Sequence, residues 1–129
     1  MRKNIELNYI NMCKEARELQ EIWQPFPDDL IYIINNKKIQ TLKSKDSNIL
    51  YFQSGLNANI NECVWLPTQY QLEHLISKYR IFWNFYKFIH EVNQQYLIQF
   101  HREDELWLSF FMFYSYKKIW KNNQWIQQN

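Results

Sequence analysis

The chain has 129 residues, of which 47% are hydrophobic and 22% charged. These fractions exclude an extended disordered chain and are typical of a globular protein, so we expect one domain over residues 1–129. The formal net charge of +2 is too small to indicate a polyanionic partner.

Membrane insertion and secretion are not indicated either. The longest apolar run, from Leu106 to Tyr116, is interrupted by Ser109 and is far shorter than the about 20 residues that a spanning helix needs. The N-terminal residues lack the apolar core of a secretion signal. We therefore expect a cytoplasmic protein in which Cys13 and Cys63 are reduced thiols.

The first predicted element is an amphipathic helix from about Ile5 to Trp23, which Pro25 and Pro27 end. One face carries the charged residues. The opposite face carries apolar residues at spacings of three and four, namely Ile10, Cys13, Ala16, Leu19 and Trp23.

A small antiparallel sheet of three to four strands is predicted next. Its β-branched and aromatic segments are 30–34, 39–42, 49–53 and 63–66, separated by a turn at 35–38, a loop at 43–48 and an Asn-rich connection at 56–62. Gly55 is the only glycine, so we expect turns with a positive φ to use mostly asparagine.

Three C-terminal helices rich in aromatic residues complete the predicted fold. Thr68 and Gln71 have the spacing of a capping box, which predicts a helix over about 69–79. A second helix is predicted over about 81–100. The third, over about 103–120, is apolar nearly all round and should be the central buried helix. A turn at Asn122-Asn123 then lets Trp125 fold back, and the fold class is α+β.

Three stretches together resemble a family of small proteins from phages and prophages of Firmicutes. They are residues 13–25, the motif Trp65-Leu66-Pro67-Thr68-Gln69-Tyr70-Gln71-Leu72, and a C-terminal part with Leu106-Trp107-Leu108, Met112, Tyr116-Lys117-Lys118, Trp120 and Trp125. Family members typically carry Arg and Asp where this chain has Thr68 and Tyr70. The resemblance implies a phage or prophage origin, for which counter-defence is a natural role, and implies no activity.

Each residue of the central motif also has a structural explanation, because a strand, a proline and a capping box account for them. We favour that explanation over a recognition surface.

No catalytic, cofactor or metal motif of recognised form is present, so we expect no cofactor and no metal. His74, His90 and His101 have no metal-ligand spacing, and Cys63 has no histidine near it in the sequence. The segment 101–105 has the side chains of an acid/base or metal cluster, although a solvated loop before a helix is the favoured interpretation. A small enzyme with dispersed residues around His101 or Cys63 is therefore a second alternative to the functions below.

The favoured function is binding without catalysis, and it follows from the aromatic residues. Sixteen of the 24 lie between Tyr79 and Trp125. Rings at helical spacing are usually core, but so many in a small domain predict a leftover surface. That surface would bind a host protein, bind a small nucleotide-like ligand by stacking, or form a homo-oligomer. The candidate residues are Trp83, Tyr86, Trp107, Tyr114, Trp120 and Trp125.

The first alternative is a nucleic-acid-binding regulator. Four lysines decorate the predicted hairpin and its exit loop, namely Lys37, Lys38, Lys43 and Lys45. A basic β-ribbon can enter a DNA groove. Lysines on an edge strand also prevent aggregation, and this is their commoner role, which makes nucleic acid the less favoured partner.

Overall fold

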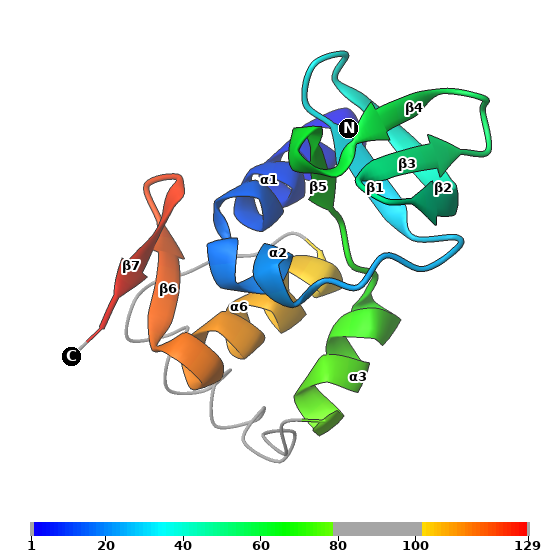
Figure 1. Cartoon of the computed structure of the whole chain (residues 1–129). Coiled ribbons are helices and arrows are strands. Elements are labelled where there is room, and N and C mark those ends of the chain that lie inside the picture. The colour runs from blue at the N-terminus through cyan, green and yellow to red at the C-terminus, as the bar shows by residue number, and fades with distance from the viewer. Residues whose placement is uncertain (1, 79–101, 129) are drawn as a thin grey trace. The chain divides into compact units, whose positions relative to one another are not determined.

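The computed structural model describes residues 2–78 and 102–128 (Figure 1). The chain divides into two compact units. We call Cys13–Pro67 the sheet unit, and Met1–Met12 together with Thr68–Asn129 the helical unit. Helices and antiparallel strands are both present, which confirms the predicted α+β class. The helix predicted over 81–100 lies outside the described residues.

The predicted N-terminal helix is interrupted, so the prediction of one helix from Ile5 to Trp23 is wrong. Helix α1 covers Arg2–Glu15 and helix α2 covers Arg17–Ile22, with Ala16 between them at φ −84° and ψ 76°. Residues spaced three apart drift by about 60° per step around a continuous helix. The break at Ala16 changes the direction of the helix axis between α1 and α2. The apolar residues Ile10, Cys13, Ala16 and Leu19 are all buried.

The sheet unit contains a five-stranded antiparallel sheet with strand order β4-β3-β2-β1-β5 (Figure 1). Its strands are β1 (Leu30–Ile33), β2 (Lys38–Asp46), β3 (Ile49–Phe52), β4 (Asn57–Asn59) and β5 (Cys63–Trp65). A single turn of 3-10 helix, η1 (Ile60–Glu62), leads from β4 into β5, which pairs with β1. The first four strands therefore form a meander, and the fifth returns to the first.

Two connections predicted in this sheet are wrong. Residues 43–46 continue β2 instead of forming a loop, because they pair with the apolar strand β3 as far as Asp46↔Ile49. The Asn-rich segment contains β4, in which Ala58 pairs with Leu50 and is 8% exposed. Cross-strand pairing overrides the weak strand propensity of these polar residues.

The core of the sheet unit lies on one face of the sheet. Directly paired residues in an antiparallel sheet share a face, as Leu42 and Phe52 do. The face buries Ile31, Ile33, Leu42, Leu50, Phe52 and Ala58, and Trp23, Ile60 and Cys63 pack against this cluster.

The helical unit is built around helix α6 (Glu103–Tyr116), which has seven buried residues. This confirms the predicted buried helix over its described length. Helix α3 (Gln69–Lys78) contacts α6 and buries Leu72 and Ile76 completely. At the start of α6 the guanidinium of Arg102 lies 5.7 Å from the centre of the Tyr9 ring of α1, a cation–π contact.

A C-terminal hairpin replaces the last turn of the predicted third helix. Lys117 is left-handed at φ 57° and ends α6, so the helix stops four residues before Trp120. Strands β6 (Lys118–Lys121) and β7 (Gln124–Gln127) then pair, and Trp125 lies opposite Trp120 as the predicted fold-back requires. Asn122 and Asn123 both have a positive φ, which suits a two-residue hairpin turn.

Asparagine does not dominate the turns, contrary to the sequence prediction. Among the described residues, only two of the six non-glycine residues with positive φ are asparagine. The other four are Asp28, Lys37, Ser47 and Lys117. Tertiary and cross-strand contacts therefore keep these residues at a positive φ, which their side chains do not favour in isolation.

Candidate binding surface

The predicted aromatic binding residues fall into three groups. Trp107 and Trp120 are buried, with 8% and 9% of their surface exposed. Tyr114 and Trp125 are half-buried, and the Trp125 Nε1–H donates to the Met12 carbonyl at 2.9 Å. Trp83 and Tyr86 lie outside the described residues.

Helix α6 uses its rings as core. Phe110 and Phe111 are fully buried, and Trp107 meets Phe110 edge to face with ring centres 6.3 Å apart. Phe113, Tyr114 and Tyr116 are half-buried. Of the six aromatic side chains of this helix, three are therefore buried, three are half-buried and none is exposed.

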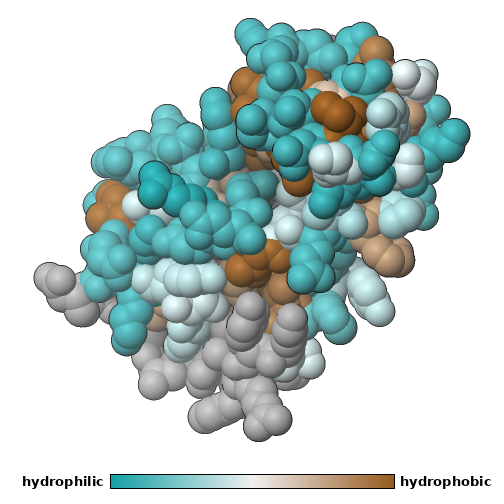
Figure 2. Space-filling view, in the orientation of Figure 1, coloured by the Kyte–Doolittle hydropathy of each residue, from teal (hydrophilic) through white to brown (hydrophobic). Residues whose placement is uncertain are grey.

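The exposed apolar side chains lie mainly in the other unit. Seven large hydrophobic residues are exposed in the described part of the chain, and five of them belong to the sheet unit. These five are Phe26, Leu30, Ile39, Tyr51 and Leu56; the remaining two are Leu7 and Tyr70. Figure 2 shows hydrophobic atoms emerging among hydrophilic ones over the strands of the sheet unit.

Three of the five share the side of the sheet opposite its core. Leu30 pairs with Thr41, Tyr32 with Ile39, and Tyr51 with Ser44, and each pair alternates along its strand with core residues. We call this side the outer face and define it by Leu30, Tyr32, Ile39, Thr41 and Tyr51. Leu30, Ile39 and Tyr51 are each 37–39% exposed.

A fixed turn before β1 carries the most exposed of the five. Phe26 stands between Pro25 and Pro27 and is 71% exposed. The buried Asp29 carboxylate accepts from the Phe26 backbone N–H at 2.9 Å and from the Trp23 indole N–H at 3.0 Å. The Trp23 ring stacks on Trp65, with 6.1 Å between ring centres. The prediction from sequence did not include this turn. A Pro-Phe-Pro segment is nevertheless a recognisable signal for a constrained, solvent-facing ring.

The four predicted lysines are exposed but do not form one cluster. Lys37 is in the β1–β2 turn and Lys38 begins β2, whereas Lys43 and Lys45 lie near its other end, roughly 20 Å along the strand. β2 is the central strand of the described sheet, so the prediction of edge-strand lysines is wrong. The β1–β2 hairpin has β5 and β3 on its two sides and is not an isolated ribbon.

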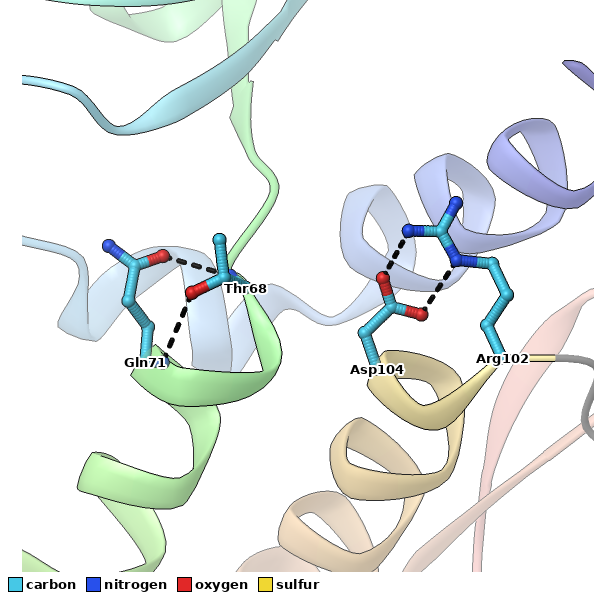
Figure 3. Close-up of polar contacts among 4 residues, drawn as sticks. All are labelled: Thr68, Gln71, Arg102 and Asp104. Carbon is cyan, nitrogen blue, oxygen red and sulfur yellow. Dashed lines mark hydrogen bonds and ion pairs between the residues drawn. The ribbon is translucent and has the colours of Figure 1, made fainter. Parts of the chain in front are cut away.

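The acidic residues of the segment 101–105 form the first turn of α6, where Asp104 makes an ion pair with Arg102 (Figure 3). Arg102 Nε donates to Asp104 Oδ1 at 3.0 Å, and Asp104 belongs to the first turn of α6. Three acidic residues there suit the positive end of the helix dipole. His101 lies outside the described residues. Within the described ranges, no group of three or more His, Cys, Asp and Glu side chains could hold a metal ion.

The cysteine geometry does not indicate an activated nucleophile. Neither cysteine forms a disulfide within the described residues, and Cys13 is buried. Burial, assisted by the neighbouring Glu62 carboxylate, raises the pKa of the Cys63 thiol to about 11. The thiol donates to the Asn59 carbonyl at 3.4 Å. A raised pKa keeps the group protonated and poorly nucleophilic.

The central sequence motif has the structural roles that the sequence predicts. Gln71 N–H donates to Thr68 Oγ1 at 3.2 Å, and Thr68 N–H donates to Gln71 Oε1 at 2.9 Å, which confirms the capping box (Figure 3). Before it, Trp65 ends β5, and its backbone N–H and C=O bond to the side-chain amide of Gln20 at 2.8 and 3.0 Å. Gln20 thus occupies the free edge of β5.

No helix in the described residues is long and apolar enough to cross a membrane. Comparisons with protein-family models, with curated proteins and with solved structures find no match to this chain.

Proposed function

We propose that this protein is non-catalytic and acts by binding a partner protein through its sheet unit. The observation that carries the proposal is the placement of exposed apolar side chains, five of which lie in this unit. Leu30, Ile39 and Tyr51 share the outer face with Tyr32 and Thr41. A mixed aliphatic and aromatic face with few charges favours a protein partner.

The proposal moves the binding surface away from helix α6. The described part of the aromatic-rich region uses its rings internally, which supports a structural role for Trp107 and Trp120. A contribution of Trp83 and Tyr86 stays part of the hypothesis, since both lie outside the described residues. The phage or prophage origin, a counter-defence role and action in the cytoplasm are also proposals. They rest on the family resemblance and on two cysteines that form no disulfide within the described residues.

Affinity purification with matched surface variants tests the proposal. The tagged protein is incubated with a lysate of Firmicutes cells, which the resemblance implies as hosts, and captured proteins are identified by mass spectrometry. We expect Ile39→Glu and Tyr51→Glu to lose a partner that Tyr70→Glu retains, because Tyr70 is an exposed ring outside the sheet unit. Equal capture by all three variants contradicts the proposal.

Light scattering on the purified protein separates a homo-oligomer from a foreign partner. A dimer that Ile39→Glu dissociates would assign the outer face to a second copy of the chain. A monomer unaffected by either outer-face variant leaves that face available for the partner that we propose.

One observation favours nucleic acid as a second candidate. Tyr51 pairs with Ser44, and the exposed Lys43 adjoins Ser44 at the register shift between Leu42 and Ser44, whereas Lys45 pairs with the core residue Leu50. Rings that stack on bases and lysines that contact phosphates are typical of single-strand binding. Binding of a 20-nucleotide single strand that weakens steeply with salt supports this candidate, and the absence of binding at low salt eliminates it.

A further inference from the structure

We infer that strand β7 pairs with β7 of a second copy of the chain, antiparallel and centred on Ile126, so that two C-terminal hairpins form one four-stranded sheet. The inference goes beyond the proposed function, because β7 belongs to the helical unit whereas the proposed partner surface belongs to the sheet unit.

The outer edge of β7 presents backbone groups that the hairpin does not use. The Gln128 N–H donates to the Lys117 carbonyl at 2.7 Å, which makes these two residues a hydrogen-bonded pair at the end of the ladder. Bonded and non-bonded pairs alternate in an antiparallel ladder, so Trp125 and Gln127 direct their N–H and C=O groups away from β6. Within the described residues, no hydrogen bond reaches these four groups.

The apolar side chains of the hairpin are covered on β6 and only partly covered on β7. Ile119 and Trp120 of β6 are 4% and 9% exposed, whereas their direct partners Ile126 and Trp125 are half-buried. In Figure 1, β6 follows α6 directly and β7 returns beside it. A further strand beside β7 would therefore bury apolar surface as well as satisfy backbone groups.

A two-fold axis at Ile126 pairs all four free groups with those of the second copy. Trp125 then lies opposite Gln127 of the second copy, and each such pair exchanges two N–H···O=C bonds. An axis at Trp125 would pair that residue with itself and place Gln127 opposite Asn123 of the turn. The edge is thus complementary to itself in one register.

The side chains also favour a second copy as the occupant. Directly paired residues share a face, and Ile126 pairs with Ile119 within the hairpin. The proposed axis therefore creates a row of four isoleucines, two from each copy. β7 has the sequence Gln-Trp-Ile-Gln, without a charged residue, so the pairing places no like charges opposite each other.

The edges of the five-stranded sheet are better protected against such pairing. Its edge strands are β4 and β5. In β5, the N–H and C=O of Trp65 are bonded to the Gln20 side chain, and β4 has only the three residues Asn-Ala-Asn. Short polar strands and covering side chains are the usual protection of a sheet edge, and the described residues provide neither at β7.

Light scattering on the full chain at several concentrations tests the inference. We expect a dimer with twice the chain mass of 16.2 kDa. Gln127→Pro should weaken dimerisation at least tenfold, because proline removes an N–H that points away from the hairpin. Asn57→Pro is the matched control, because it places a proline on edge strand β4, and Ile39→Glu changes the outer face of the other sheet. Both should leave the dimer unchanged.

Cysteine pairing tests the register and decides the question if circular dichroism shows that Gln127→Pro is unfolded. Ile126→Cys places two sulfurs at the axis, in a non-bonded pair with Cα atoms about 4.5 Å apart, which suits a disulfide. Gln124→Cys is the matched control, because its two copies would lie roughly 14 Å apart along the strands. Mild oxidation with glutathione disulfide should give a covalent dimer in Ile126→Cys and none in Gln124→Cys.

A monomer at every concentration overturns the inference. A dimer that folded Gln127→Pro retains, or that Asn57→Pro or Ile39→Glu dissociates, overturns it as well, and so does equal disulfide formation by the two cysteine variants. None of these results bears on the proposed function, which fails only if the outer-face variants capture the same partner as the original chain.

Discussion

Helix α6 and the sheet unit differ in whether they present aromatic side chains to solvent. Helix α6 is crowded with rings, yet Trp107, Phe110 and Phe111 are interior. The sheet unit has only six of the 24 aromatic residues, but two of them, Phe26 and Tyr51, are exposed. The density of aromatic residues in a sequence therefore does not locate a binding surface, because helical spacing directs a cluster inward whereas a turn or strand can present a single ring to solvent.

The largest expected effect on the free energy of unfolding comes from a comparison of one phenylalanine from each unit. Phe110→Ala removes a fully buried ring and should lower the free energy of unfolding by about 3–5 kcal/mol. Phe26→Ala removes a ring that is 71% exposed and should change it by less than about 0.5 kcal/mol. Urea denaturation followed by circular dichroism measures both.

Similar losses for the two variants would contradict the contrast between the units. A large loss of unfolding free energy in Phe26→Ala alone would assign that ring a structural role.

The second prediction concerns the stability that the buried Asp29 carboxylate gives to the turn before β1. Asp29→Ala leaves two partly buried donors, Phe26 N–H and Trp23 Nε1–H, without their acceptor and should destabilise the protein by about 1–3 kcal/mol. The matched control is Asp28→Asn, because Asp28 is exposed at φ 76° and asparagine tolerates that conformation. Equal stability of the two variants in urea would show that the buried carboxylate does not hold the turn.

The capping box gives a smaller effect in the helical unit. Thr68→Ala removes the hydroxyl that accepts from Gln71 N–H and should lower the free energy of unfolding by about 1 kcal/mol. Thr68→Ser retains the hydroxyl and is expected to stay close to the original stability. A loss in Thr68→Ser as large as in Thr68→Ala would assign the effect to the methyl group instead of the cap.

The last prediction concerns the pH dependence of the stability of the sheet unit. Burial raises the pKa of Cys63 from its ordinary value of 9.0 to about 11, so the folded state holds this proton more tightly than the unfolded state. The contribution is fully present below about pH 9 and is lost as the pH rises toward about 11. Stability should fall less steeply over this range in Cys63→Ala than in the original chain, and parallel profiles would contradict the raised pKa.

The sequence predicts the elements whose signal is local. The Thr68–Gln71 capping box, strands β1, β3 and β5 and the buried character of α6 all follow from spacing and residue type. The break at Ala16 does not, because it depends on where both halves of the apolar stripe are buried. Strand β4 was missed since Asn57–Asn59 has no strand propensity and exists through pairing with β3.

The candidate surface was less predictable than the fold. Cross-strand register determines that Leu30, Ile39 and Tyr51 share the outer face, and register is a tertiary property. The turn at Phe26 depends on Asp29, whose buried carboxylate cannot be distinguished from that of exposed Asp28 in an Asp-Asp pair. The two prolines around Phe26 were the available signal.

Photo-crosslinking in Firmicutes cells, which we propose as hosts from the family resemblance, tests most directly whether the sheet unit is the docking surface. The photoreactive residue p-benzoylphenylalanine is placed at Phe26, Ile39 or Tyr51 and, for comparison, at Phe113 or Tyr114 of α6. We predict that the sheet-unit positions yield the same covalent partner and that the α6 positions yield none. A partner captured only from Phe113 or Tyr114 would return the binding surface to the aromatic helix and contradict the account.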